Sequence, residues 1–121
     1  MKVMNAKVAV LCWEDSRPWV SALRQNGYSV PWVEEPKGDA YRQIPRLGAD
    51  VVLIDLTRQL ERTREMIIDL AGREELKEVP IVVVSEKQGT VQGLRVEPEK
   101  LIVAKPSGII AAIKSALSAR D

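Results

Sequence analysis

The stretch that decides the fold is Asp50-Val51-Val52-Leu53-Ile54-Asp55-Leu56, where four apolar residues stand in a row before an aspartate. A continuous apolar run of this length is typical of a strand covered on both faces, as strands inside a parallel sheet are. Similar apolar, β-branched runs fall in residues 8–12, 29–33, 80–85 and 101–104. The chain therefore predicts five strands.

Segments with the apolar spacing of helices separate these runs. In the first, Trp19, Val20 and Leu23 stand at i, i+1 and i+4, and Gly27 follows as a natural helix end. Further apolar stripes fall in residues 40–47, 60–71 and 109–117. Strands that alternate with helices predict a three-layer, doubly wound α/β domain around a five-stranded parallel sheet.

Two crossovers are expected to be irregular. Pro45 should distort or shorten the helix of residues 40–47, because proline lacks the N–H and its ring clashes with the preceding turn. Residues 86–100 contain two glycines and Pro98, and their apolar residues form no stripe. We therefore expect a degraded fourth helix there, with much loop.

Composition excludes several classes of protein. The length of 121 residues predicts a single domain over residues 1–121, and 45% apolar residues exclude general disorder. A net charge of +1 provides no overall attraction for nucleic acid or anionic membranes. The chain has no histidine, which excludes Ser-His and Cys-His nucleophile pairs. One cysteine and no long apolar segment predict a cytoplasmic protein.

Polar side chains follow four of the predicted strands directly. They are Glu14 and Asp15 after the first strand, Asp55 at the third, Ser85 at the fourth and Lys105 at the fifth. Ligands of doubly wound domains bind outside the carboxyl ends of the strands, so these residues are candidates for one site. Three carboxylates repel one another unless a cation neutralises them, and oxygen-only ligands favour a hard ion such as Mg²⁺.

This constellation resembles the receiver domain of two-component response regulators, which is CheY-like, over residues 7–117. The positions that carry the resemblance are the acidic pair Glu14-Asp15, Asp55 in Val-Val-Leu-Ile-Asp-Leu, Ser85, and Lys105-Pro106. The resemblance implies a strand order of 2-1-3-4-5. It also implies that Asp55 accepts a phosphoryl group, with Ser85 and Lys105 as its catalytic helpers. Mg²⁺ would then be held by Glu14, Asp15 and Asp55.

The resemblance also implies partners. The phosphoryl group would come from a histidine kinase or a phosphotransfer protein, and output would pass through contact with a downstream protein. A homodimer is a further partner that the resemblance allows, while nucleic acid and membranes are not expected. The protein would not be an enzyme, beyond its own phosphorylation and dephosphorylation at Asp55.

Several positions depart from the receiver pattern. The first helix is about one turn short, and the loop after Asp55 lacks the usual Pro and Gly. Glu86 stands where receivers prefer a small residue, and its charge would repel a phosphoryl donor. Ile102 stands where many receivers place the aromatic residue that rotates on activation. These departures favour an alternative, a pseudo-receiver that works as a phosphorylation-independent interaction or dimerisation domain.

Other interpretations concern Cys12, Lys105 and the arginines near Asp55. IIB subunits of sugar phosphotransferase systems carry phosphate on a cysteine placed like Cys12, but Trp13 and two acids would obstruct phosphate here, so we expect a core cysteine.

Arg58, Arg62 and Arg64 are expected to form a solvated helix face. Lys105 is expected to pair with Asp55. In place of a metal, Lys105 or an Arg58 folded over the pocket would neutralise the carboxylates.

Overall fold

The computed structural model of the chain describes residues 6–87 and 100–120. Five parallel strands form one sheet in the order β2-β1-β3-β4-β5, which confirms the expected topology. Each predicted run contributes one strand: β1 (Lys7–Leu11), β2 (Ser29–Glu34), β3 (Val51–Asp55), β4 (Ile81–Val84) and β5 (Leu101–Ala104).

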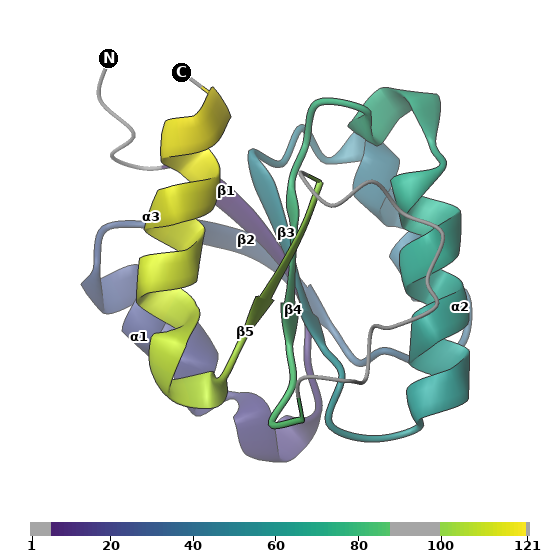
Figure 1. The fold of residues 1–121 in the computed structure, drawn as a ribbon, viewed down its shortest axis with the longest axis horizontal. Coiled ribbons are helices and arrows are strands. Elements are labelled where there is room, and N and C mark those ends of the chain that lie inside the picture. The colour runs from purple at the N-terminus through teal and green to yellow at the C-terminus, as the bar shows by residue number, and fades with distance from the viewer. Residues whose placement is uncertain (1–5, 88–99, 121) are drawn as a thin grey trace.

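Helices cover both faces of this sheet. The α-helices are α1 (Pro18–Gln25), α2 (Leu60–Ala71) and α3 (Ile109–Arg120). Short 3-10 helices are η1 (Glu14–Ser16), η2 (Ala40–Arg46), η3 (Glu74–Leu76) and η5 (Pro106–Gly108). In Figure 1, α1 and α3 lie on one side of the sheet and α2 lies on the other. The three layers of the predicted fold are therefore present.

The core consists of two apolar clusters, one on each face of the sheet. The first joins alternate strand residues such as Val10 and Leu53 to side chains of α1 and α3. The second joins the intervening strand residues, such as Leu11 and Ile54, to η2 and α2. Successive strand side chains point to opposite faces, so a strand that serves both clusters must be apolar at every position. This explains the continuous apolar runs.

The irregular segments have local causes. Residues 40–46 form the 3-10 helix η2, with Pro45 inside it, as the proline predicted. The first helix is short because residues 14–16 form the separate turn η1 before α1 begins at Pro18. Gly27 follows α1 with a φ of 89°, a conformation that glycine adopts without steric cost. The expected degraded fourth helix lies almost wholly outside the described residues.

The described helices include none long and apolar enough to cross a membrane.

Candidate functional site

All of the predicted site residues lie at the carboxyl edge of the sheet. Asp55 is the last residue of β3, while Ser85 and Lys105 directly follow β4 and β5. Glu14 and Asp15 lie in η1, just after β1. Parallel strands bring their carboxyl ends to one edge, and Asp55 pairs in register with Val84, the residue before Ser85. The roles of these residues stay predictions.

The carboxylate of Asp55 is fully buried, with an exposed fraction of 0%. Its Oδ2 accepts hydrogen bonds from the Trp13 backbone N–H at 3.2 Å and from the Ser16 hydroxyl at 2.7 Å. Its Oδ1 accepts from the Thr57 backbone N–H at 3.1 Å and from the Thr57 hydroxyl at 2.5 Å. Each oxygen therefore has two donors, and the chain itself satisfies the buried group.

Local structure explains how these donors reach Asp55. After β1 the chain turns into η1, in which the Ser16 N–H donates to the Trp13 carbonyl at 2.9 Å. This turn directs the Trp13 N–H and the buried Ser16 hydroxyl toward the same oxygen of Asp55, Oδ2. The Thr57 bonds form an Asx-type turn, in which an aspartate side chain accepts from the backbone two residues later.

Asp15, the second residue of the acidic pair Glu14-Asp15, is paired with an arginine. The Arg58 guanidinium forms an ion pair with the Asp15 carboxylate, and both side chains are more than half exposed. The same guanidinium lies over the Trp13 ring, with Cζ 5.8 Å from the ring centroid. Arg58 therefore links the loop after β3 to the turn after β1, as one of the sequence interpretations anticipated.

Trp13 is buried, with an exposed fraction of 7%. Its indole Nε1 is also buried and has no hydrogen-bond partner among the described residues. A buried donor without a partner is uncommon and costs free energy. The ring is therefore held by packing and by its contact with Arg58, not by its polar atom.

The residues expected to hold Mg²⁺ do not fit that ion as they are arranged. In residues 6–87 and 100–120, no three Asp, Glu, His or Cys side chains gather closely enough to hold a metal. Glu14 and Asp15 are exposed, and Asp15 already has a cationic partner. Both oxygens of Asp55 accept hydrogen bonds from the chain. The magnesium site stays a prediction.

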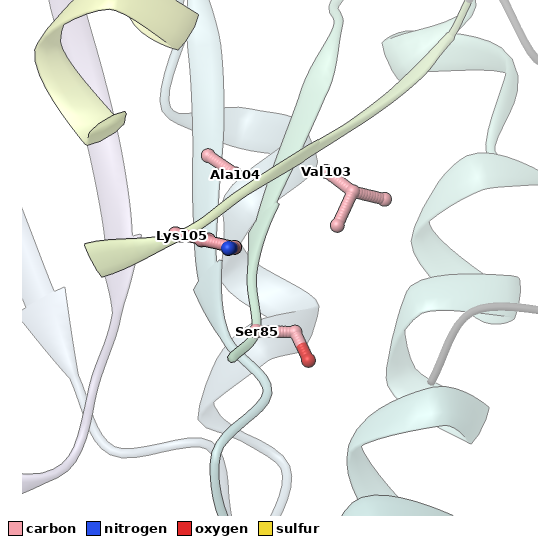
Figure 2. A pocket seen from close by; sticks show the side chains of 4 residues that line it. All are labelled: Ser85, Val103, Ala104 and Lys105. Atoms are coloured by element: carbon pink, nitrogen blue, oxygen red, sulfur yellow. The ribbon is translucent and has the colours of Figure 1, made fainter. Parts of the chain in front are cut away.

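Ser85 and Lys105 line a hollow of about 250 Å³, together with Val103 and Ala104. Figure 2 shows the Ser85 hydroxyl pointing away from the Lys105 nitrogen. That hydroxyl donates to the Lys87 carbonyl at 2.9 Å and accepts from the Lys87 N–H at 3.2 Å. Lys105 is exposed, and no ion pair joins it to Asp55. The pairing expected between these two residues is therefore not formed.

The other departures from the receiver pattern have clear places. Glu86 is exposed two residues after β4, and Ile102 is half-buried on β5, where it packs against the cluster shared with α1 and α3. Cys12 is a buried core residue, and burial raises the pKa of its thiol to about 11.

Of the three arginines expected on a solvated helix face, Arg62 is exposed and donates to the Gly38 carbonyl at 3.4 Å. Arg64 is half-buried, and Arg58 precedes α2 and pairs with Asp15, so that expectation holds only in part.

Solved structures resemble this chain over nearly its whole length. The signal receiver domain of a modulated diguanylate cyclase from Desulfovibrio desulfuricans G20 superimposes with a TM-score of 0.68 at 22% identity, covering 97% of this chain and 96% of that one. A CheY-like response regulator receiver domain from Methylobacillus flagellatus superimposes with a TM-score of 0.67 at 17% identity, covering 98% and 99%. The chain has the receiver-domain fold. No protein-family model matches the chain, and no curated protein sequence matches it either.

A third receiver structure has the same extent. The receiver of a response regulator receiver modulated diguanylate cyclase from Pelobacter carbinolicus superimposes with a TM-score of 0.65 at 17% identity, covering 97% of this chain and 95% of that one. These superpositions show the receiver fold, and at identities this low the chemistry of the site has to be argued from its own residues.

Sequence reasoning missed three participants of this receiver-fold site. The sequence analysis linked none of Ser16, Trp13 and Thr57 to Asp55. The position of Thr57, two residues after a strand-end aspartate, is a local signal for an Asx-type turn. The contacts of Trp13 and Ser16 span 42 and 39 residues, so no local pattern predicts them.

Proposed function

We propose that this chain is a pseudo-receiver, an interaction module with the receiver fold that works without phosphorylation of Asp55. The observation that carries this proposal is the state of the Asp55 carboxylate, which is fully buried and accepts four hydrogen bonds from Trp13, Ser16 and Thr57. In this interpretation Asp55 is a structural acceptor that holds the turn after β1 against the loop after β3.

The chemistry of phosphoryl transfer supports the same conclusion. A carboxylate that attacks phosphorus needs a free lone pair, an open path in line with the leaving group and cations that neutralise the phosphoryl oxygens. Four donors hold the lone pairs of Asp55, and two of them are hydroxyls that would have to turn away. The cation nearest in sequence, Arg58, is paired with Asp15.

The phosphoacceptor role is the second candidate. It is favoured by one observation: Asp55, Ser85 and Lys105 end neighbouring strands at the same edge, and Ser85 and Lys105 line a hollow there. In that role Asp55 would take a phosphoryl group from a histidine kinase or a phosphotransfer protein, with Mg²⁺ at Glu14, Asp15 and Asp55. Donor entry would require the Ser16 and Thr57 hydroxyls to release the carboxylate.

In either role, we propose that output passes through contact with a protein partner. We propose a protein-binding module, because a net charge of +1 provides no overall attraction for nucleic acid or membranes. A second copy of the chain is one candidate partner. Light scattering across protein concentration distinguishes a homodimer from a module that binds a different protein.

Incubation with a small phosphodonor and Mg²⁺ tests the proposal. We expect intact-mass spectra of the native chain to show no added phosphoryl group, and ¹⁹F spectra to show no bound beryllofluoride. Glu86→Ala should behave in the same way, because the exposed Glu86 side chain is not among the donors that hold the Asp55 carboxylate. A single phosphoryl group on the native chain that is lost in Asp55→Asn would establish the phosphoacceptor role instead.

A further inference from the structure

Arg58 makes two contacts with the turn that follows β1, next to the buried Asp55 carboxylate. Its guanidinium pairs with Asp15 in η1 and lies over the Trp13 ring, whose backbone N–H donates to Asp55. Arg58 is three residues beyond Asp55 in the chain, so one side chain connects the segments that follow β1 and β3. The receiver resemblance assigns no role to this residue.

We propose that Arg58 is the resident cation of this site, and that its guanidinium takes the charge-neutralising place for which the receiver resemblance predicts Mg²⁺. The proposal goes beyond the pseudo-receiver function, since it concerns what neutralises the acidic residues and not whether Asp55 is modified.

The chemistry of the guanidinium suits this place. It is planar, charged at every ordinary pH and weakly hydrated, so one face can lie on an aromatic ring while its edge donates to a carboxylate. Arg58 does both, on Trp13 and Asp15. A hydrated divalent ion cannot stack on the indole in this way, and the described residues contain no group of three acidic side chains that would hold it.

The disagreement with the expected metal site has a direct structural cause. Asp15 is engaged by Arg58, and the oxygens of Asp55 are engaged by Trp13, Ser16 and Thr57. Glu14 is an exposed carboxylate on the short turn η1. Removing the Arg58 guanidinium leaves Asp15 beside Glu14 without its ion-pair partner.

Thermal unfolding in MgCl₂ and in NaCl of matched ionic strength tests the proposal on the full chain. The native protein should have the same Tm in both salts. Arg58→Ala removes the contacts with Asp15 and Trp13 and should lower the Tm in NaCl by about 4 °C, the size of shift that a weak contact gives in a chain of this length. At least half of that loss should return in 10 mM MgCl₂. The matched control is Arg62→Ala, whose guanidinium bonds a backbone carbonyl; it should not distinguish the two salts.

A proton chemical-shift measurement on the native chain and on Asp15→Asn completes the test. The aliphatic protons next to the Arg58 guanidinium should show an upfield ring-current shift from Trp13, and Asp15→Asn should reduce that shift. The proposal is overturned if Mg²⁺ stabilises the native protein more than matched NaCl does. It is equally overturned if Arg58→Ala and Arg62→Ala respond to Mg²⁺ alike, or if the native Arg58 protons are unshifted. None of these results alters whether Asp55 takes a phosphoryl group.

Discussion

The Ser16 hydroxyl donates a hydrogen bond of 2.7 Å to Oδ2 of Asp55, across 39 residues of the chain. Both residues are buried, and the bond ties the 3-10 turn after β1 to the end of β3. The Ser16 hydroxyl thus donates to a carboxylate that the receiver resemblance predicts to bind a metal ion. This relationship makes the centre of the site a structural contact that mutation can measure.

Ser16→Ala should lower the free energy of unfolding by about 2 kcal/mol, because it leaves a buried carboxylate oxygen short of one donor. Urea unfolding followed by tryptophan fluorescence measures this change. Ser21→Ala, an exposed serine on α1, is the control and should change stability by less than about 0.5 kcal/mol. Equal effects of the two substitutions would show that the Ser16 bond does not contribute.

Asp69 should make stability depend on pH through its bond with Tyr41. The Tyr41 hydroxyl donates to Asp69 at 2.6 Å, and this bond, followed by those from Arg73, lowers the pKa of Asp69 below its ordinary 3.8. The lowered pKa means that the stabilisation is complete above about pH 5 and is lost as pH falls through the pKa of the folded chain.

Tyr41→Phe tests this expectation. At pH 7 it should cost about 1 kcal/mol in the free energy of unfolding, and the difference from the native chain should shrink as pH falls toward 3. Urea unfolding at several pH values measures both. A difference that stays constant over the whole range would mean that the Tyr41 bond does not favour the ionised form of Asp69.

Gln59→Gly should stabilise the protein by about 0.5–1 kcal/mol. Gln59 precedes α2 with a φ of 50° and a ψ of 55°, the left-handed conformation that costs a residue with a side chain about 1–2 kcal/mol. Glycine removes most of that cost but adds entropy to the unfolded chain. Gln43→Gly, in η2 with no such conformation, is the control and should destabilise the protein. Thermal unfolding decides the sign for each.

Cys12 should resist alkylation in the folded protein. The side chain is buried, and burial raises the pKa of its thiol to about 11, so little of the reactive thiolate is present at pH 8. Iodoacetamide followed by intact-mass measurement should show slow labelling of the native chain and rapid labelling in urea. Rapid labelling without denaturant would mean that the end of β1 opens far more often than its packing implies.

Much of the fold could be predicted because its signals are local. The apolar run before Asp55 marks a strand that is covered on both faces, and every other strand was found within two residues of its predicted bounds. Pro45 predicted an irregular second crossover, and residues 40–46 form a 3-10 helix. Each of these features depends on side chains that are close in sequence, where backbone sterics and apolar periodicity decide the outcome.

The site could be predicted only as a set of positions. Strand ends in a parallel sheet must meet at one edge, so Asp55, Ser85 and Lys105 follow from the strand assignments alone. Their partners do not. Lys105 was expected to pair with Asp55, yet Asp55 is satisfied by Ser16 and Thr57, and Lys105 stays exposed.

By itself, the sequence determined the strands, their parallel arrangement and which residues stand at the carboxyl edge of the sheet, since these depend on periodicity and on the rules of parallel crossovers. The strand order followed from the resemblance to receiver domains. Only the tertiary structure decided that Asp55 is buried and fully hydrogen-bonded, and that Arg58 lies on Trp13 and pairs with Asp15. The reason is physical: several donors and cations compete for each carboxylate, and the winner depends on how two turns, about 40 residues apart, are aimed at each other.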